Sequence, residues 1–380
     1  MTVRRILVAL IVVSSAFIAP AGAQTTTDYL GIRTSALGRA VRLAKTASLA
    51  QAVGISPTIE LNVQRHSDPA LEITELATRF GMQLTPLQLG QVASLRRLDG
   101  DLQAALADTI GAFTGFKIAA SAGTFADVVA ARGVLLDSVV RLEAFGGADV
   151  EHSGICAPLD LTPVLLLDVT GCDNVYDSDW VALSIDFGGD DVYRNNAGGV
   201  STYDGRGAPT LRGPAAATID LDGDDLYEQD WKPWYFVATN GSALFGSGFL
   251  LDAAGNDTYI GGNGSAVAHM DLGPFIIPTP SLRPVSSGFL MDVGGDDFYL
   301  GCNGCAAAFS HSFPAGVARA LLFDAGGFDS YQSGSPRYPG ETRTECTDAP
   351  KNSGPPNGDF DERGAAVGAQ IDFPHTDCPT

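Results

Sequence analysis

The second half of the chain repeats one pattern of hydrophobic and polar positions. A few apolar residues precede an Asp, an acidic turn with glycine follows, and a segment containing a Tyr ends the unit. Residues 290–299, LMDVGGDDFY, are a clear copy. The apolar run predicts a buried strand. The glycine three residues after the Asp, Gly295 in this copy, suits a tight turn with positive φ. Each copy therefore predicts a strand, a turn and a second strand.

The pattern recurs at nearly regular intervals. Its first Asp is Asp168, Asp186, Asp220, Asp252, Asp292 and Asp324 in successive copies. The first copy is degenerate, with one extra residue before its Tyr, and the later steps are 34, 32, 40 and 32 residues. A second glycine-rich corner recurs as well, because residues 259–266 align with 299–306. A period in this range indicates a solenoid, a propeller or an array.

We predict a mainly β fold: a repeat β-solenoid similar to a parallel β-helix, preceded by a small α-helical domain. A β-propeller is the alternative. A unit of about 32 residues fits one coil with two or three short strands, whereas four-stranded propeller blades usually need about 40 or more. The Tyr of each copy lies two residues after the second Asp, on the same strand face. We expect it to stack on the Tyr of the next copy.

The N-terminal part has helical periodicity and no copy of the motif. The sequence predicts a helix over 34–53, a helix capped by Asp68, and a helix capped by Thr124 with Asp127. Residues 85–88 form a capping box, and apolar residues then recur at helical spacing at Val92, Leu95, Leu98, Leu102, Leu106 and Ile110. These stripes predict the core of a helix bundle.

The predicted divisions are a signal peptide at 1–23, an α-helical domain at 24–150, a β-repeat domain at 151–332 and an irregular C-terminal cap at 333–380. Terminal repeats need caps because their stacking faces would otherwise be exposed. The N-terminal helices are candidates to cap the opposite end. Residues 365–372, which end in Asp372, form a candidate last strand that lacks the acidic turn.

The first residues have the layout of a secretory signal. Arg4 and Arg5 precede an apolar run over 6–18 that is too short to span a bilayer, and Ala23 ends a small-residue cleavage site. We predict export, with a mature chain beginning at Gln24. No later apolar run is long enough for a membrane helix.

All six cysteines follow residue 150. An even number in an oxidising compartment favours disulfides, and sequence alone does not select among the pairings. We predict the local set Cys156–Cys172, Cys302–Cys305 and Cys346–Cys378. For Cys302 and Cys305, a redox or zinc role is the alternative.

Acidic residues are concentrated in the repeats. The net charge is −21, and residues 151–380 contain 10 Lys and Arg against 32 Asp and Glu. Such a surface repels nucleic acid. Two carboxylates in one tight turn can instead converge on a hard cation such as calcium. The candidate metal ligands are Asp186, Asp190, Asp191, Asp220, Asp222, Asp224, Asp225, Asp252, Asp257, Asp292, Asp296, Asp297, Asp324 and Asp329. The competing interpretation is that these side chains only accept hydrogen bonds from turn amides.

The turn resembles half of the nonapeptide of RTX calcium-binding proteins. Gly189, Asp191 and Tyr193 match the Gly, Asp and hydrophobic positions of Gly-Gly-x-Gly-x-Asp-x-hydrophobic-x, as do the equivalent residues of the later copies. RTX motifs recur every nine residues, so their stacked calcium cage does not follow here. The chain is also similar to uncharacterised secreted bacterial proteins with tandem Leu-Asp-x-Gly-Gly-x-Asp-x-Tyr repeats, a resemblance that covers about 165–331 and implies no activity.

The expected function is that of a non-enzymatic secreted or cell-surface protein, calcium-binding and structural or adhesive, with a cell-surface polysaccharide or protein as partner. The alternative is a carbohydrate-active enzyme, a polysaccharide lyase or glycosidase, because acid pairs serve such chemistry and Trp231, Trp234 and Tyr235 could stack on sugars. No Gly-x-Ser-x-Gly elbow is present, and the five histidines are scattered. We therefore predict no catalytic residue.

Overall fold

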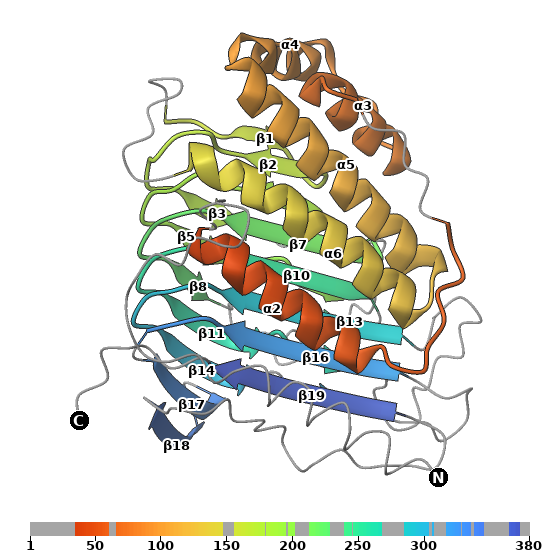
Figure 1. The fold of residues 1–380 in the computed structure, drawn as a ribbon. Helices are drawn as coiled ribbons and strands as arrows, with labels where there is room; N and C mark the ends of the chain where they lie inside the picture. Colours follow the sequence, from red (N-terminus) through yellow and green to blue (C-terminus); the bar gives the residue numbers. More distant parts are fainter. Residues whose placement is uncertain are drawn as a thin grey trace, which may run out of the picture.

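The computed structural model describes residues 35–60, 66–146, 156–178, 180–194, 197–201, 213–228, 239–244, 246–267, 285–303, 306–307, 317–327, 329–335, 338–345 and 365–372. A small helical region comes first, and strands in three mostly parallel sheets follow (Figure 1). The predicted signal peptide lies outside the described residues.

Five α-helices and two short 3-10 helices make up the described part of the helical region. They are α2 (Ala36–Gln51), α3 (Pro69–Arg79), α4 (Pro86–Ser94), η1 (Leu95–Arg97), α5 (Gly100–Ala122), α6 (Phe125–Leu142) and η2 (Glu143–Phe145). The predicted caps are confirmed. The Asp68 side chain accepts from the Ala70 amide, and capping boxes begin α4 at Thr85 and α6 at Thr124.

The apolar stripe that follows Thr85 is divided between helices. The spacing from Val92 to Ile110 predicted continuous helix, but the chain leaves the helix at Leu98, whose backbone is extended. Asp99 then accepts hydrogen bonds from the amides of Asp101 and Leu102 and begins α5. In a continuous helix these amides would bond to backbone carbonyls one turn earlier. The Asp99 side chain accepts from them instead, so the break leaves neither amide without a partner at the start of α5.

The first sheet has eight strands in the order β1-β2-β4-β7-β10-β13-β16-β19. The strands are β1 (Leu159–Leu161), β2 (Leu165–Leu167), β4 (Leu183–Ile185), β7 (Ala215–Asp220), β10 (Ser247–Asp252), β13 (Val285–Asp292), β16 (Val317–Asp324) and β19 (Ala365–Asp372). All neighbours in this sheet are parallel except β1 and β2.

The second sheet has seven strands and the third has four. The second runs β18 (Tyr338–Glu345), β17 (Asp329–Ser335), β14 (Phe298–Asn303), β11 (Thr258–Asn263), β8 (Leu226–Glu228), β5 (Val192–Arg194), β3 (Val175–Asp177), and only β17 and β18 pair antiparallel. The third runs β15 (Ala306–Ala307), β12 (Ala266–Val267), β9 (Ala243–Leu244), β6 (Val200–Ser201). Each sheet is open within the described residues.

Equivalent residues of successive copies pair with each other. Asp252 lies opposite Asp220 on one side and Asp292 on the other, and Tyr259 lies opposite Tyr227 and Tyr299. The predicted stacking of tyrosines is confirmed, because the rings of Tyr227 and Tyr259 are parallel to within 3° with centroids 4.8 Å apart. The sequence period is therefore the spacing between strands that are neighbours in space.

Helices α2, α5 and α6 lie over one face of the eight-stranded sheet, and α4 lies at its β1 edge (Figure 1). Alternate residues of β10 divide between two environments. Phe249 and Leu251 share a hydrophobic core with the helices, whereas Leu250 belongs to a second cluster with the tyrosines on the other face. Phe249 meets Phe116 of α5 edge-on at 6.3 Å. The helices were predicted to cap one end of the repeats: α4 does contact the edge strand β1, but α2, α5 and α6 cover the apolar outer face of the sheet.

The predicted irregular C-terminal cap needs correction, because the range 333–380 contains regular strands. β19 pairs in parallel with β16 over its whole length, with Asp372 opposite Asp324. β17 continues to Ser335 and pairs with β18. The candidate last strand at 365–372 is confirmed.

Two further features join neighbouring segments. The predicted Cys156–Cys172 disulfide is present, whereas the side chains of the other four cysteines lie outside the described residues. The turn glycines approach each other closely. Gly295 has φ +154°, and a Cβ placed on it would lie 1.4 Å from the carbonyl oxygen of Gly255 in the preceding copy. Only glycine fits there, so the turns of successive copies stack backbone against backbone.

Candidate metal centre

The two Asp residues of each motif point into the space between the first and second sheets. The first ends a strand of the eight-stranded sheet, and the second directly precedes a strand of the seven-stranded sheet. The intervening turn brings them together. Asp252 is fully buried and Asp257 is 1% exposed, and the same holds within 3% for the equivalent residues from Asp186 to Asp329.

The buried carboxylates form four clusters, which we call carboxylate clusters. Each joins the second Asp of one copy to both Asp residues of the next. Their members are Asp191, Asp220 and Asp225; Asp225, Asp252 and Asp257; Asp257, Asp292 and Asp297; and Asp297, Asp324 and Asp329. In each cluster one oxygen from every residue lies within 4.8 Å of the others. Two ligands of one calcium ion, each at about 2.4 Å, lie at most about 4.8 Å apart. The clusters therefore could hold a metal ion.

Tyrosine hydroxyls line the same space. The hydroxyl of Tyr259 lies 2.7 Å from Oδ2 of Asp292 and 3.0 Å from Oδ2 of Asp252. Tyr227 is placed equivalently, 2.6 Å from Oδ2 of Asp252 and 3.4 Å from Oδ2 of Asp220. A phenol has one proton to donate. It cannot serve both carboxylates, so a second proton or a cation must reduce the repulsion.

Backbone amides satisfy one oxygen of most of these carboxylates. The amide of Asp225 donates to Oδ1 of Asp257 at 2.7 Å, and the amide of Asp257 donates to Oδ1 of Asp297 at 2.7 Å. We call this series of bonds the inner amide ladder. The first Asp of a motif uses its own turn instead, as when the Gly294 amide donates to Oδ1 of Asp292 at 3.1 Å. These bonds fix the carboxylates in position and leave their second oxygens directed to the clusters.

Several of those second oxygens have no hydrogen-bond partner among the described residues. They are Oδ2 of Asp191, Asp257 and Asp297, and Oδ1 of Asp252 is in the same situation. An unsatisfied buried polar atom costs about 1–3 kcal/mol, and more when it is charged. Four such atoms along one row are difficult to explain by turn hydrogen bonds alone. A bound cation satisfies oxygens of this kind.

The electrostatics of the row disfavour bare carboxylates. Burial raises the pKa of Asp191 to about 8, with the charge of Asp220 adding to it. Burial and the charges of Asp292 and Asp324 raise the pKa of Asp297 to about 12. The pKa of Asp252 is likewise raised well above its usual value by burial and by Asp220 and Asp292. Without a cation, burial and mutual repulsion therefore favour the protonated forms of these carboxyls.

Five of the predicted ligands lie outside the clusters, four of them on the turns. Asp190, Asp224 and Asp296 are exposed on the turns, and Asp222 is half-buried. Asp190 and Asp224 accept backbone amides from the next copy: the Asp224 amide donates to Asp190 at 3.1 Å, and the Asn256 amide to Asp224 at 2.8 Å. We call this the outer amide ladder, and it runs opposite to the inner one. At these positions the turn hydrogen-bond interpretation fits.

Asp186, also a predicted ligand, is buried but belongs to none of the four clusters; it accepts a hydrogen bond from the Tyr176 hydroxyl. Asp168, the first Asp of the degenerate copy, was not among the predicted ligands; it is 2% exposed, bonds to Thr170 and Asn174, and belongs to none of the four clusters. Sequence reasoning gave the tyrosines a stacking role only. The step of seven residues from first Asp to Tyr, which five of the six copies share, was the available signal for the hydroxyl contacts.

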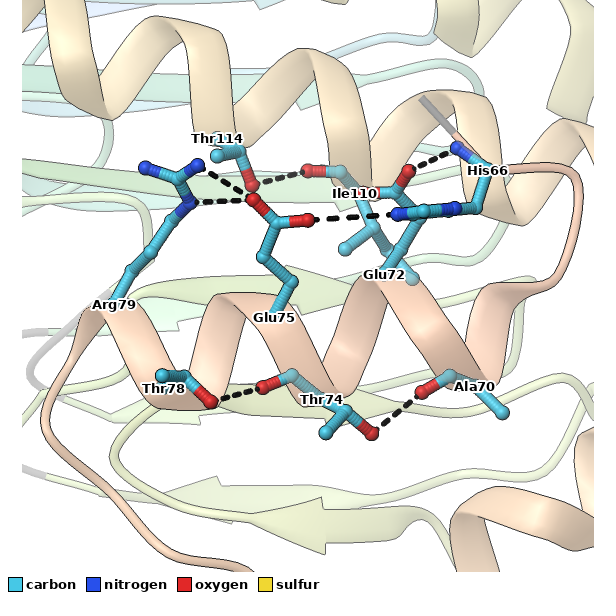
Figure 2. Close-up of polar contacts among 9 residues, drawn as sticks. All are labelled: His66, Ala70, Glu72, Thr74, Glu75, Thr78, Arg79, Ile110 and Thr114. Carbon is cyan, nitrogen blue, oxygen red and sulfur yellow. Dashed lines mark hydrogen bonds and ion pairs between the residues drawn. The ribbon is translucent and has the colours of Figure 1, made fainter. Parts of the chain in front are cut away.

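The helical layer has polar contacts of another kind (Figure 2). His66 lies 3.6 Å from Glu75, which also pairs with Arg79 one turn along α3 at 2.5 Å. The His66 amide donates to the buried carboxylate of Glu72 at 2.5 Å. The hydroxyl of Thr114 donates to the carbonyl of Ile110 in its own helix at 3.1 Å. Each group is paired locally, so these contacts hold α3 and its entry segment in place.

No protein-family model matches the chain, and no curated protein and no solved structure matches it either. Among the helices that the structure describes, none is long and apolar enough to cross a membrane.

Proposed function

We propose that the chain is a calcium-stabilised β-solenoid that acts outside the cell as a non-enzymatic structural or adhesive scaffold. The observation that carries the proposal is the row of buried carboxylate clusters in which Asp191, Asp252, Asp257 and Asp297 each have an oxygen without a hydrogen-bond partner in the described chain. The scaffold role follows from the same row, because its ions lie between repeats where they join one repeat to the next.

The strand pairing supports a solenoid over a propeller. In a propeller, the strands of one repeat pair with each other as a blade. In this chain, β11 pairs with β8 and β14, its counterparts in the neighbouring copies, and does so in parallel. The copies that begin at Asp252 and Asp292 each give one strand to all three sheets. Coils stacked on one another produce this pattern.

Charge balance supports bound divalent ions. The four clusters contain nine different Asp residues. Fully ionised, they carry nine negative charges, and four divalent ions supply eight positive charges. Buried charges are tolerated only when they are paired or bind metals. One ion in each cluster would therefore bring the row close to neutrality while leaving the carboxylates ionised.

The donor set supports calcium among the divalent ions. Every ligand in the clusters is a carboxylate, and the nearest additional donors are tyrosine hydroxyls such as that of Tyr227, 3.3 Å from Oδ2 of Asp225. Zinc prefers Cys and His ligands. Magnesium keeps several waters, whereas calcium accepts an irregular set of protein oxygens. A site closed between two sheets suits the ion that needs less water.

Luminescent terbium is a direct test, because it replaces calcium at oxygen sites and receives energy from nearby tyrosines. We expect tyrosine-sensitised terbium emission that calcium displaces, with up to four ions bound in the described part of the chain. Asp257→Asn alters two clusters at once and should reduce the number of ions by one or two. Asp224→Asn, on the outer amide ladder, is the matched control and should leave the number unchanged.

Equal stoichiometry in wild type and Asp257→Asn would sink the assignment. So would the absence of calcium binding at millimolar concentration in a folded sample, because the row would then contain carboxylic acids that share protons. In that case the solenoid part of the proposal would be retained and the calcium part would be rejected.

The carbohydrate-active alternative receives little support from the buried row. A glycosidase acid and base must reach the scissile bond. The clustered carboxylates are at most 3% exposed, so a sugar does not reach them. The residues Trp231, Trp234 and Tyr235 lie outside the described chain. A cell-surface polysaccharide or protein as binding partner remains part of the scaffold proposal.

A further inference from the structure

A second candidate site lies in the helical layer, away from the carboxylate clusters. A cavity of about 140 Å³ is present between α2 and α6, which pack side by side on the eight-stranded sheet (Figure 1). Its lining includes Ser48 and Leu49 of α2 and Val129, Arg132 and Leu136 of α6. The side chains of Lys45 and Asp137 also line it and pair with each other at 2.6 Å.

The unusual group in this cavity is Arg132, which is 1% exposed. One guanidinium nitrogen, Nη1, donates to the hydroxyl of Ser287 on β13 at 3.3 Å, and the guanidinium carbon lies 4.4 Å from the centre of the Phe289 ring. Nε and Nη2 find no acceptor within the described chain. No carboxylate of the described residues lies within ion-pair distance of Arg132.

Ser48 gives a second, independent observation. Its side chain is 2% exposed, and its hydroxyl also lacks a partner in the part of the chain that the structure describes. A serine in the interior of a helix commonly donates to the carbonyl four residues earlier. Ser48 does not, although Thr46 of the same helix does so to Arg42 at 3.0 Å. Arg132 and Ser48 thus both line the cavity, and each has a buried donor without a partner in the described chain.

A buried arginine without a counter-ion is expensive. The penalty for removing an ion from water is several kcal/mol. The contact with the Phe289 ring recovers only part of this penalty. Burial accordingly lowers the pKa of Arg132 to about 9. The missing element is an anion that accepts from Nε and Nη2 together, since these two donors form one edge of the guanidinium fork.

We propose that this cavity binds a small organic carboxylate, with Arg132 and Ser48 as its donors. A carboxylate matches the guanidinium fork with two parallel hydrogen bonds. Apart from the paired Lys45 and Asp137, the remaining walls are mostly apolar, including Leu49, Val129 and Leu136, and suit a short hydrocarbon part. The volume equals that of about five waters, enough for a carboxylate and a few carbons. Inorganic phosphate is also an anion, but it has no apolar part to contact the apolar walls of the cavity.

The test measures thermal midpoints of the full chain with sodium butyrate, sodium phosphate or sodium chloride at equal ionic strength. Calcium is kept saturating, so the result does not depend on the proposed function. We expect butyrate to raise the midpoint of the wild type, because a ligand that binds only the folded state stabilises it. Arg132→Met retains the bulk and removes the donors. We expect the butyrate shift to disappear in this variant.

Ser48→Ala gives a graded second variant. Loss of one hydrogen bond to a charged ligand, about 1.5–3 kcal/mol, corresponds to a loss of affinity of about tenfold to a hundredfold. Titration calorimetry with butyrate measures it. The proposal is overturned if butyrate gives the wild type no shift, or the same shift as in Arg132→Met. It is also overturned if phosphate stabilises the wild type as much as butyrate, because the site would then be a general oxyanion site.

If Arg132→Met does not fold, Ser48→Ala decides. An unchanged butyrate affinity in that variant contradicts the assignment, and a loss of tenfold or more supports it. Without anion, Arg132→Met should be at least as stable as the wild type, since hydrophobic residues that replace buried ions are often neutral or stabilising.

Discussion

Asp127 and Asp257 are equally buried, at 1% exposure each, and their carboxyls behave in opposite ways. Asp127, in the helical region, receives hydrogen bonds from the amides of Thr58, Ile59 and Thr124, at 2.6–3.1 Å, and from two hydroxyls. Burial alone would raise its pKa, but these donors outweigh burial and lower the pKa to about 2.

Asp257, in the repeats, receives one amide at 2.7 Å and has an oxygen without a partner in the described chain. Burial and the neighbouring charges of Asp252, Asp292 and Asp297 raise its pKa far above the usual range. Burial of an acid is therefore not by itself a sign of a site. The supply of donors decides whether a buried carboxylate is satisfied within the protein or requires a proton or a cation.

The largest expected effect comes from removing calcium at neutral pH. An ion at a hundredfold excess over its Kd contributes about 2.7 kcal/mol, so four ions contribute about 10 kcal/mol to the free energy of unfolding. The thermal midpoint should fall by on the order of 20 °C when a chelator replaces calcium. Calorimetry of the mature chain measures this. An unchanged midpoint would mean that the clustered carboxyls, like that of Asp127, are stable within the protein without a bound ion.

The pH dependence without calcium should be the reverse of that with calcium. The raised pKa values of Asp191, about 8, and Asp297, about 12, mean that the folded state holds protons that the unfolded state releases above about pH 4. This contribution is complete below about pH 4 and is lost as pH rises through the folded-state pKa.

Between about pH 4 and 8, each such group then lowers the free energy of unfolding by about 1.4 kcal/mol per pH unit. With calcium present, stability should rise with pH, because metal ligands must be deprotonated. Chemical denaturation at several pH values, with calcium and with chelator, measures both slopes. Parallel slopes would contradict the metal assignment.

Matched substitutions separate the two acids. Asp127→Asn should lower the free energy of unfolding by about 2–3 kcal/mol at pH 7, with or without calcium, because amides that met a carboxylate would face an amide group. Asp257→Asn should destabilise the protein in calcium, and in chelator it should be neutral or stabilising by about 1–3 kcal/mol, because it removes an acid from a crowded site. Urea denaturation of both variants measures this, and a loss for Asp257→Asn in chelator as large as in calcium would remove the distinction.

The smallest effect concerns the tyrosine row. Tyr259→Phe retains the stacked ring and removes the hydroxyl between Asp252 and Asp292, at a cost of about 1 kcal/mol in calcium. Denaturation in urea measures the change, and terbium emission reports whether the ion remains. A substitution that also abolishes ion binding would make the hydroxyl a metal ligand instead of a supporting hydrogen-bond donor.

Much of the repeat structure was predictable because its period is written in the sequence. Copies such as those at Asp252 and Asp292 align residue by residue, and parallel register preserves that alignment in space. The inward direction of the Asp residues was harder to predict. In β10, Leu250 and Leu251 lie on opposite faces and both are buried, one beside the tyrosines and one beside the helices. The strand therefore has no alternation of apolar and polar residues, and the sequence did not indicate on which side of the sheet the Asp252 side chain lies.

The helical region shows the limit of local patterns. Its caps were predicted correctly because Thr124 and Asp127 interact with nearby backbone. The break at Leu98 was missed because apolar spacing continues across it, and only the cap at Asp99 marks the new helix. The place of the helices was also missed. An apolar stripe indicates that a helix packs against another apolar surface, but it does not identify that surface. In this chain the surface is the outer face of the first sheet. The site at Arg132 depends on that docking and has no sequence signature.

The inner amide ladder and the shared clusters have a consequence for how such a chain can change its length. Each cluster takes one carboxylate from one copy and two from the next, and the same amide-to-carboxylate bond links Asp225 to Asp257 and Asp257 to Asp297. Duplicating a gene segment of one period would add two buried acids and one new cluster, which a single divalent ion would neutralise. Deleting a segment of one period would bring together two copies whose Asp residues still form a complete cluster. If each repeat binds the proposed ion, recombination would lengthen or shorten the stack without accumulating buried charge.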